Sequence, residues 1–387
     1  NKRAEDGSIS ENSFNIGNNK DPIIECLVFS FPRTRKLTVN KIKSLGLKFG
    51  IWIEPEMIQV GSEIFKTHPE YACTVPFREP IERRHQLMID MSNPEVIKYL
   101  FNSLSKVIKE VKPKYIKWDF NRNMSEAYSH YGTKSGELMF NYVYGIYRLM
   151  DKLTTAFPDI LFEGCSSGGG RFDLGIAYYM PQSWGSDNSN SYCRSFISCG
   201  TFAGYPQSTL GAHVSRDTHS IDEKSHIASL EDRFNLQCIG GFGYEFDITT
   251  LTKEELEIIK NQVNFYKKHR KLIQFGNFEI IDNIFDNNDY LSYQISDDEH
   301  KKNVLVVIQT KPQLKGKEWK LKGLEENKKY SVSIREHMDG NNIDLVKKVY
   351  LGKELMNDGI KLPNLDVNNK NKEFTGISSR MIFVEEN

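Results

Sequence analysis

Two aspartates stand shortly after short segments that are predicted to be strands. Asp119 directly follows residues 115–118, and Asp187 comes soon after residues 182–184. Carboxyl groups at the ends of nearby parallel strands can face one sugar carbon, where one attacks and the other protonates the departing oxygen. A pair about 5 Å apart retains the sugar's configuration, whereas a wider pair admits water and inverts it. The sequence therefore predicts a carboxylate-rich site and leaves the separation of the two carboxyl groups open.

Other chemically capable residues follow similar runs. The segment 165–173 contains three consecutive glycines but lacks the Lys-Ser/Thr of a P-loop. A tight turn or a close backbone approach to a ligand is therefore favoured over a phosphate cradle. Lys117 stands two residues before Asp119, and a buried lysine needs a partner or a ligand. Each residue also has a structural explanation when taken singly: an Asp as a helix cap or turn residue, and Cys165 as a buried apolar side chain.

The elements that must position these residues alternate between strands and helices. Asn93 before Pro94 predicts a helix start, with Asn as the N-cap and Pro at the first helical position. Thr252 with Glu255 three residues later predicts a capping box at a second helix. Alternating strands and helices with short connections are typical of a parallel α/β domain. In parallel α/β barrels, the catalytic residues lie at the C-terminal ends of the strands, and Asp119 stands at such a position.

The pattern changes near Gly276. Beyond it, short β-rich runs alternate with Asn, Asp, Gly and Lys turns, which predicts a small antiparallel β-sandwich over residues 277–387. Residues 22–276 are assigned to the α/β domain. Residues 1–21 are polar and are expected to form a disordered lead-in.

Composition excludes several classes of protein. The 51 basic residues balance 51 acidic ones, which argues against a nucleic-acid partner. The six cysteines form no CxxC pair and no metal-like spacing with histidine, so we expect free thiols and no metal site. No run of apolar residues has the length of a membrane span, and residues 1–7 have no signal-peptide core. The expected location is cytoplasmic, with no membrane partner.

Several ordered motifs resemble the family-36 α-galactosidases. Four of them are similar to that family's early barrel strand, nucleophile motif, glycine-rich loop and acid/base motif: FGIWIEPEM at 49–57, KWDFNR at 117–122, CSSGGGRFD at 165–173 and WGSDN at 184–188. Shorter motifs at 84–87, 211–215 and 243–247 follow the same order. The resemblance extends from about residue 30 to the end of the chain.

The resemblance implies a (β/α)₈ barrel followed by a C-terminal β-sandwich. It casts Asp119 as nucleophile and Asp187 as general acid/base of a retaining mechanism. It also implies that six residues line the sugar pocket: Lys117, Asn121, Cys165, Gly168, Arg84 and Trp52. No cofactor is implied. The implied partner is an α-galactoside oligosaccharide, and family members tend to form homo-oligomers.

The chain departs from the family pattern in three ways. First, it has no counterpart of the family's N-terminal β-domain. Second, the first two barrel strands of the family, which include a D-D-G-W-F segment, have no counterpart before residue 30, so that six of the eight expected strands are counted. Third, Ser189 and Asn190 replace the T-D that usually ends the acid/base motif. The leading hypothesis is hydrolysis of terminal α-linked galactose from melibiose- or raffinose-type sugars. The alternatives are an α-N-acetylgalactosaminidase or transgalactosylase of the same family, a truncated and catalytically inactive remnant, and a carbohydrate-binding module without turnover.

Overall fold

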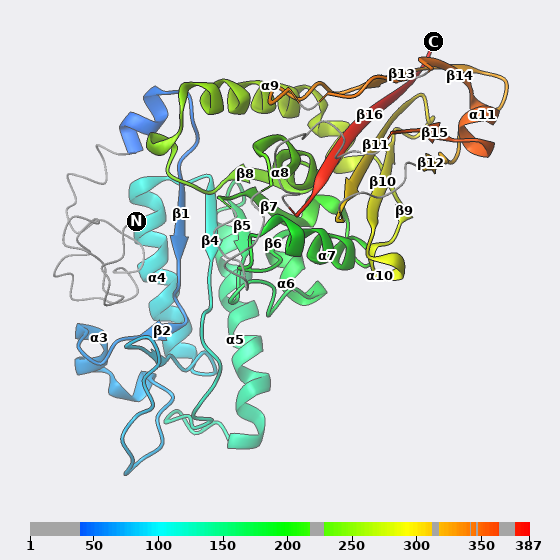
Figure 1. Cartoon of the computed structure of the whole chain (residues 1–387). Coiled ribbons are helices and arrows are strands. Elements are labelled where there is room, and N and C mark those ends of the chain that lie inside the picture. Colours follow the sequence, from blue (N-terminus) through cyan, green and yellow to red (C-terminus); the bar gives the residue numbers. More distant parts are fainter. Residues whose placement is uncertain (1–38, 217–227, 312–316, 341, 346, 364–375) are drawn as a thin grey trace. The chain divides into compact units, whose positions relative to one another are not determined.

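The computed structural model describes residues 39–216, 228–311, 317–340, 342–345, 347–363 and 376–387 (Figure 1). The chain divides into two compact units, Asn1–Trp184 and Gly185–Asn387. The predicted lead-in, residues 1–21, lies outside the described residues. The predicted domain boundary near Gly276 lies within the second unit and stays a prediction.

The first unit is built around four parallel strands in the order β1-β4-β5-β6. Their bounds are Gly50–Ile53 for β1, Tyr115–Trp118 for β4, Leu161–Gly164 for β5 and Gln182–Trp184 for β6. Strands β4 and β6 have the bounds that the sequence predicts. The sequence also predicts strands at 48–53 and 160–162, and the observed β1 and β5 begin two residues and one residue later, because the pattern alone does not show where ladder pairing begins.

The register of this sheet aligns one residue from each of the four strands. Trp52 of β1 is the partner of Lys117 in β4, Lys117 is the partner of Glu163 in β5, and Glu163 is the partner of Gln182 in β6. Partners in a parallel sheet point to the same side. These four side chains therefore form a row across the sheet, and the residues two positions further on form the next row toward the strand ends.

Two long helices, α4 and α5, run alongside these strands (Figure 1). The helices of the unit are α3 (Glu63–Thr67), α4 (Pro94–Val111), α5 (Ser135–Ala156) and α6 (Leu174–Tyr179), with a 3₁₀ turn at Pro69–Tyr71 and a two-stranded antiparallel sheet of β2 (Met57–Ile58) and β3 (Leu87–Met88). Residues 39–44 are also helical. The predicted start of α4 is confirmed, because the Asn93 side chain accepts a hydrogen bond from the backbone N–H of Glu95.

The core of the first unit lies where these helices pack on the sheet. Leu100 of α4, Ile116 of β4, Leu149 of α5 and Phe162 of β5 are buried in one apolar cluster. Truncating such a side chain to alanine costs about 2–5 kcal/mol of stability. This packing fixes the strands, and through them the side chains at the strand ends.

The second unit begins with further strand–helix elements. Strands β7 (Leu210–Val214) and β8 (Gly241–Tyr244) pair in parallel. The helices are α7 (Ser191–Phe202), α8 (Leu230–Gln237) and α9 (Lys253–Phe275), with 3₁₀ turns at Gln207–Thr209 and Ile248–Thr250. The capping box of Thr252 and Glu255 opens α9 as predicted. The sequence predicts a strand at 242–247, and the observed β8 ends at Tyr244, three residues earlier, because Asp247 instead caps the following turn.

The rest of the second unit is antiparallel, as the sequence predicts. A six-stranded sheet has the order β14-β13-β16-β11-β10-β9, and a smaller sheet pairs β12 with β15. The bounds are Asn277–Asp282 for β9, Tyr290–Ser296 for β10, Lys302–Gln309 for β11, Glu318–Trp319 for β12, Lys329–Ile334 for β13, Val349–Leu351 for β14, Ile360–Lys361 for β15 and Ser378–Glu386 for β16. Two short helices, α10 (Ile284–Asn287) and α11 (Gly352–Asn357), complete it. One apolar cluster includes Trp319 and Ile360 of the small sheet and Leu305 of the large one.

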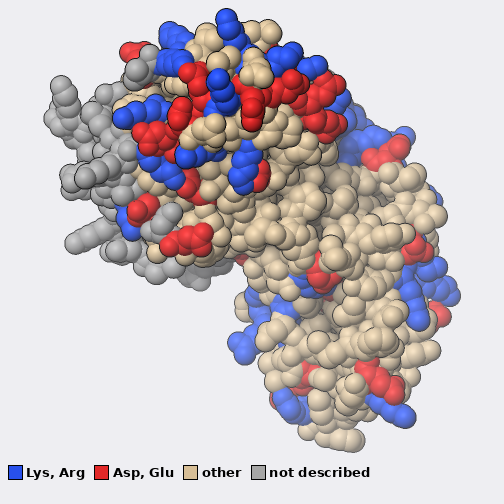
Figure 2. Space-filling model, turned by 90° about the vertical axis from the view of Figure 1, so that its right-hand side faces the viewer, with Lys and Arg blue, Asp and Glu red and all other residues tan. Residues whose placement is uncertain are grey.

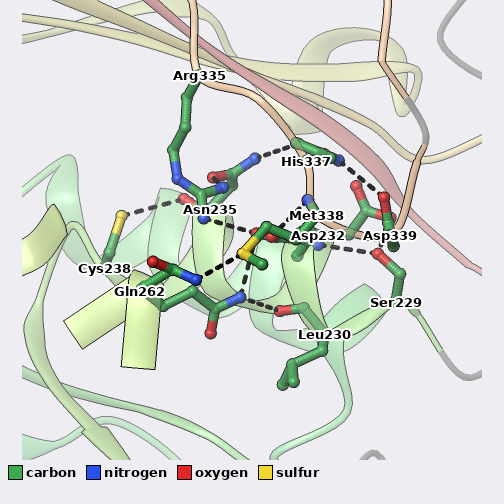
Figure 3. A network of polar contacts seen from close by, with 12 residues as sticks. Ser229, Leu230, Asp232, Asn235, Cys238, Gln262, Arg335, His337, Met338 and Asp339 are labelled. Carbon is green, nitrogen blue, oxygen red and sulfur yellow. Dashed lines mark hydrogen bonds and ion pairs between the residues drawn. The ribbon is translucent and has the colours of Figure 1, made fainter. Parts of the chain in front are cut away.

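A buried polar network joins α8 to this antiparallel sheet (Figure 3). Glu231 accepts hydrogen bonds from Arg335 (2.6 Å) and from the backbone N–H of Met338 (3.0 Å). Asp232 accepts from the backbone N–H (2.6 Å) and hydroxyl (2.8 Å) of Ser379 in β16. Such buried charges are tolerated only when they are paired and hydrogen-bonded. The network therefore connects the strand–helix part of this unit with its antiparallel sheet.

Charged side chains of both signs lie on the described surface that Figure 2 shows. On the face drawn in Figure 2, acidic and basic side chains are interspersed. Within the described ranges, no helix has both the length and the apolarity to cross a membrane. No group of three His, Cys, Asp or Glu side chains suited to a metal ion was found among those same residues. The five cysteines that the structure describes are free thiols, and Cys26 lies outside the described part.

Candidate active site

Asp119 lies at the C-terminal end of β4, where the sequence predicts it. Its side chain is held by two donors, the indole N–H of Trp52 to Oδ2 at 3.0 Å and the backbone N–H of Phe120 to Oδ1 at 2.9 Å. The residue is only 6% exposed. The carboxylate is thus fixed in direction at the edge of the sheet, which a nucleophile requires.

Lys117 lies one row below Asp119 on the same strand. Its ammonium nitrogen is 3.6 Å from Oε1 of Glu163 and 4.5 Å from the centre of the Trp184 ring. The predicted need for a partner is therefore met by a carboxylate and an aromatic face from the next two strands. Glu163 was not among the predicted site residues.

Cys165 directly follows β5 and is also next to Asp119. Its backbone N–H donates to the carbonyl of Trp118 at 2.8 Å, which ties the glycine-rich loop to the end of β4. Burial raises the pKa of the Cys165 thiol to about 12, and the charge of Asp119 and a hydrogen bond to that carboxylate add to the rise. The thiol therefore stays protonated at neutral pH and acts as a hydrogen-bond donor, not as a nucleophile.

Glu54 and Asn121 form the neighbouring part of the site. The side-chain and backbone N–H groups of Asn121 both donate to Oε1 of Glu54, at 2.9 and 3.1 Å. The pKa of Glu54 is raised, mainly by burial and in smaller part by the charge of the Asp119 carboxylate. The hydrogen bonds from Asn121 and the charge of Arg84 work in the opposite direction. Glu54 belongs to the motif at 49–57 and was not among the predicted site residues.

Arg84 approaches Glu54 from a loop with unusual backbone geometry. Arg84 and His85 both lie in the left-handed region, with φ of 56° and 58°. Backbone of this kind costs energy for residues other than glycine and persists where surrounding contacts enforce it. Those contacts come from Arg122, which donates to the carbonyls of Gln86 and Ile81. The loop that carries Arg84 is thus fastened to the segment that follows Asp119.

The glycine-rich loop turns tightly beside Cys165. Gly168 has a φ of 88°, and its carbonyl accepts from the backbone N–H of Ser166 at 2.8 Å. A Cβ at Gly170 would come within 2.7 Å of the Ser166 carbonyl oxygen. The tight-turn interpretation of the triple glycine is therefore consistent with the local geometry, and Gly168 lies beside Cys165 in that turn.

Beneath the strand ends lies a cluster that the sequence analysis did not predict. Glu56 is fully buried and accepts four hydrogen bonds: two from Arg171 (3.0 and 2.8 Å), one from Trp118 (2.7 Å) and one from Tyr142 (2.9 Å). Although burial works to lower the pKa of Arg171, the Glu56 carboxylate prevails and raises it. Glu56 therefore joins the end of β1, the residue before Asp119 and the glycine-rich loop.

Asp187 is exposed on a loop of the second unit. Arg194 of α7 donates to the carbonyl of Ser186 at 2.6 Å, and the Ser186 hydroxyl accepts from the backbone N–H of Asn188 at 3.1 Å. Burial lowers the pKa of Arg194 to about 10, while the carboxylates of Glu245 and Asp187 work in the opposite direction. The separation between the carboxyl groups of Asp187 and Asp119 stays a prediction.

Within the first unit, Trp52, Lys117, Cys165 and Asn121 are brought together around Asp119 or its neighbour Glu54. Arg84 is linked to this group through Glu54. One signal for the partner Glu163 exists in the sequence, because a buried lysine at a predicted strand position demands an anion. Which strand supplies that anion depends on register, which the sequence does not give.

Comparison with known proteins shows the family of this chain. A model of the Melibiase family matches residues 28–276, and a model of the glycosyl hydrolase family 36 C-terminal domain matches residues 291–384. The chain belongs to glycoside hydrolase family 36. The resemblance and the fold class predicted from the sequence are therefore confirmed.

Family members of known activity or structure match over much of the chain. The α-galactosidase AgaA of Geobacillus stearothermophilus is 40% identical over 84% of this chain and 43% of its own length. The crystal structure of an α-galactosidase from Lactobacillus brevis matches with a TM-score of 0.84 at 37% identity, covering 92% of this chain and 47% of that one. A variant of AgaA in complex with stachyose matches with a TM-score of 0.79 at 35% identity, over 90% of this chain and 46% of that one. The chain thus spans less than half the length of these relatives.

Proposed function

We propose that this chain carries the catalytic centre of a retaining α-galactosidase that releases terminal α-linked galactose from melibiose- or raffinose-type sugars. The observation that carries the proposal is the environment of Asp119: a buried carboxylate at a strand end, oriented by Trp52, with the Cys165 thiol beside it and Lys117 one row below. Relatives crystallised with raffinose and stachyose support the choice of substrate.

The proposed reaction has two steps. In the first, Asp119 attacks the anomeric carbon, the bond from that carbon to the leaving oxygen breaks, and Asp187 donates a proton to this oxygen. The product is a galactosyl ester on Asp119. In the second, Asp187 takes a proton from water, the water oxygen attacks the anomeric carbon, and the ester bond breaks with net retention of configuration. This mechanism requires the two carboxyl groups to be about 5–6 Å apart.

Six residues are proposed to bind the sugar. The Lys117 ammonium, the Asn121 amide and the Arg84 guanidinium each supply hydrogen-bond donors for galactose hydroxyls, whereas Cys165, whose single S–H donates to Asp119, offers the sugar its sulfur as a weak acceptor. The Trp52 indole is 38% exposed and offers an aromatic surface as well as its hydrogen bond to Asp119. Gly168 has no side chain and so lets the backbone approach the sugar closely.

A covalent trap tests the nucleophile in the chain as it stands. A fluorinated α-galactoside with an activated leaving group should slow the second step more than the first, so that the galactosyl ester accumulates. Mass spectrometry of digested protein is expected to find the added sugar on the peptide that contains Asp119. Asp119→Asn should abolish the adduct, whereas Asp159→Asn, at an exposed site, should not. An adduct on another carboxylate would refute the assignment.

Parallel substrates separate the proposal from its alternatives. Where the chain hydrolyses an aryl α-galactoside, hydrolysis of the corresponding α-N-acetylgalactosaminide should be at least tenfold slower, because the acetamido group needs additional space and partners. Preference for the second substrate would make the chain an α-N-acetylgalactosaminidase. Saturable binding of galactose with neither adduct nor hydrolysis would leave a binding module and would contradict the proposed activity.

A further inference from the structure

The environment of Lys117 is set by the sheet itself. Lys117, Glu163 and Gln182 are register partners on three adjacent strands, so their side chains extend from neighbouring positions toward the same side. The Lys117 side chain keeps 18% of its exposure, whereas that of Glu163 keeps none. The lysine therefore reaches the accessible side of the row, and the carboxylate lies behind it.

Glu163 is a buried charge whose two oxygens have different neighbours. Oε2 accepts a hydrogen bond from the Gln182 amide at 2.8 Å, and Oε1 faces the Lys117 ammonium at 3.6 Å. A carboxylate with no exposure needs a counter-charge, and the ammonium of Lys117 supplies it. Removing the carboxylate would leave an amine that is largely withdrawn from water, where the cationic form is disfavoured.

The other groups that face Lys117 come from each neighbouring strand. The Trp184 ring of β6 lies 4.5 Å from the ammonium and favours a cation. Beyond the row stand the Asp119 carboxylate, after β4, and the Cys165 thiol, after β5. The charge of Lys117 reaches that thiol. The ammonium is thus placed between a buried anion on one side and the proposed reaction centre on the other.

We propose that Glu163 is a positioning residue, which pairs with the Lys117 ammonium and directs it at the sugar that Asp119 attacks. The identity of that sugar rests on the proposed galactosidase function. The position and accessibility of Lys117 do not, because they follow from the sheet. Glu163 itself does not touch the substrate and acts through Lys117.

Amine labelling tests this arrangement without any need for turnover. Reductive methylation modifies an amine only in its neutral form, and peptide mass spectrometry of the full chain gives the rate at each lysine. Lys114, whose side chain is 48% exposed, serves as the internal reference. In Glu163→Gln the rate at Lys117, relative to Lys114 at pH 8, should rise about tenfold, as expected for the loss of one charge-assisted contact. A ratio within twofold of the wild-type value would overturn the proposal.

Two further variants make the result specific. Glu95→Gln removes the carboxylate of an exposed pair with Lys98 on α4 and should leave the rate at Lys117 unchanged. Glu163→Asp keeps the negative charge but withdraws it from the ammonium by one methylene. It should raise the Lys117 rate by a smaller factor, about threefold, and it provides a measurement even if Glu163→Gln is too unstable to study. An unchanged rate in a folded Glu163→Asp variant would count against the proposal.

Kinetics connect the arrangement with the reaction. Where the wild-type chain hydrolyses an aryl α-galactoside, Glu163→Gln should raise KM about tenfold. It should also shift the alkaline limb of the pH–activity profile to lower pH. Glu163→Asp should show smaller changes in KM and in the pH profile. A large change in labelling with unaltered KM and pH profile would show a purely structural pair. Failure of the galactosidase proposal is recognised separately, because no ester would then form on Asp119 in the wild-type chain.

Discussion

Two buried glutamate–arginine pairs, one in each unit, are built in nearly the same way. Glu56 pairs with Arg171 at 2.8 Å, and Glu231 pairs with Arg335 at 2.6 Å. Both glutamates have no exposed surface. Each arginine also lies over a phenylalanine ring, Arg171 over Phe120 at 4.5 Å and Arg335 over Phe234 at 4.6 Å.

The surroundings of the two pairs differ. The Glu56 pair supports strand ends where Asp119 and Cys165 remain at the edge of the sheet, next to half-exposed residues. The Glu231 pair lies inside a network that joins α8 to the C-terminal sheet, and its partners Asn235 and Gln262 are buried (Figure 3). Buried ion pairs therefore do not mark an active site by themselves. The mark is a reactive group held in place above such a pair and left accessible to a ligand.

The largest expected difference between the two regions is in catalysis. Asp119→Asn should lower kcat for an aryl α-galactoside by a factor on the order of 10⁴ or more, because no group can then form the ester. Asp232→Asn, in the network of the second unit, should change kcat less than threefold in protein that remains folded. Steady-state kinetics at a temperature well below the unfolding transition measure both. Comparable losses of kcat in the two variants would contradict the proposed difference between the region around Asp119 and the network of the second unit.

The next effect concerns stability and should be shared. Arg171→Met and Arg335→Met each leave a buried glutamate without its counter-charge, which costs about 3–5 kcal/mol. Urea unfolding followed by intrinsic fluorescence should show both losses. Only Arg171→Met should also slow formation of the galactosyl ester, because only that arginine supports the loop next to Asp119. Equal rates of ester formation in the two variants would show that the Glu56 cluster does not support the residues around Asp119.

Titration in the network should make the second unit sensitive to pH. Burial raises the pKa of Asp232 to about 6 from 3.8, and burial lowers the pKa of His337 to about 3 from 6.5. Between about pH 4 and 6 the folded chain retains the Asp232 proton that the unfolded chain loses, so this group reduces stability as pH rises. His337 acts in the reverse sense from about pH 3 to 6.5, because there the unfolded chain takes up the proton.

Single variants should separate these opposing contributions. Relative to the wild type, Asp232→Asn should make the free energy of unfolding rise more steeply from pH 4 to 6, and His337→Gln should make it rise less or fall. Each difference should be roughly 1–3 kcal/mol over the interval. Chemical unfolding at several pH values measures both, with Asp159→Asn as an exposed control. Three parallel pH curves would show that neither group titrates as proposed.

The smallest expected effect concerns the thiol. Cys165→Ala removes a donor to the Asp119 carboxylate and should lower kcat/KM about tenfold, corresponding to about 1.4 kcal/mol, while Cys165→Ser keeps a donor and should lose less. Cys238→Ala, which removes a buried thiol from the second unit, should leave kcat/KM unchanged. Iodoacetamide at neutral pH should modify Cys165 slowly, and rapid alkylation would contradict a protonated thiol.

The sequence predicts the elements of this protein better than its contacts. Strand β4, the start of α4 at Asn93 and the capping box at Thr252 are local features, set by apolar runs and capping chemistry, and all are confirmed. The position of Asp119 at a strand end follows from the same local pattern. The antiparallel region after residue 276 is also recognisable from turn spacing.

The partners of buried charges depend on register and on packing between distant segments. Glu163 pairs with Lys117 across two strands separated by a helix, and no local pattern specifies that pairing. Glu231 and Asp232 open a helix, where acidic residues are normally exposed and favour the helix dipole. Their burial arises only when the antiparallel sheet, far along the sequence, supplies Arg335 and Ser379.

The four hydrogen bonds to Glu56 have a consequence for proton movement. A carboxylate offers about four acceptor positions, and here Arg171, Trp118 and Tyr142 occupy four of them. Neither the guanidinium of Arg171 nor the indole N–H of Trp118 has a lone pair that could accept a proton and relay it further. The Glu56 cluster beneath Asp119 therefore offers little path for proton transfer. Protons released or consumed at the proposed reaction centre are therefore expected to travel by the solvent side.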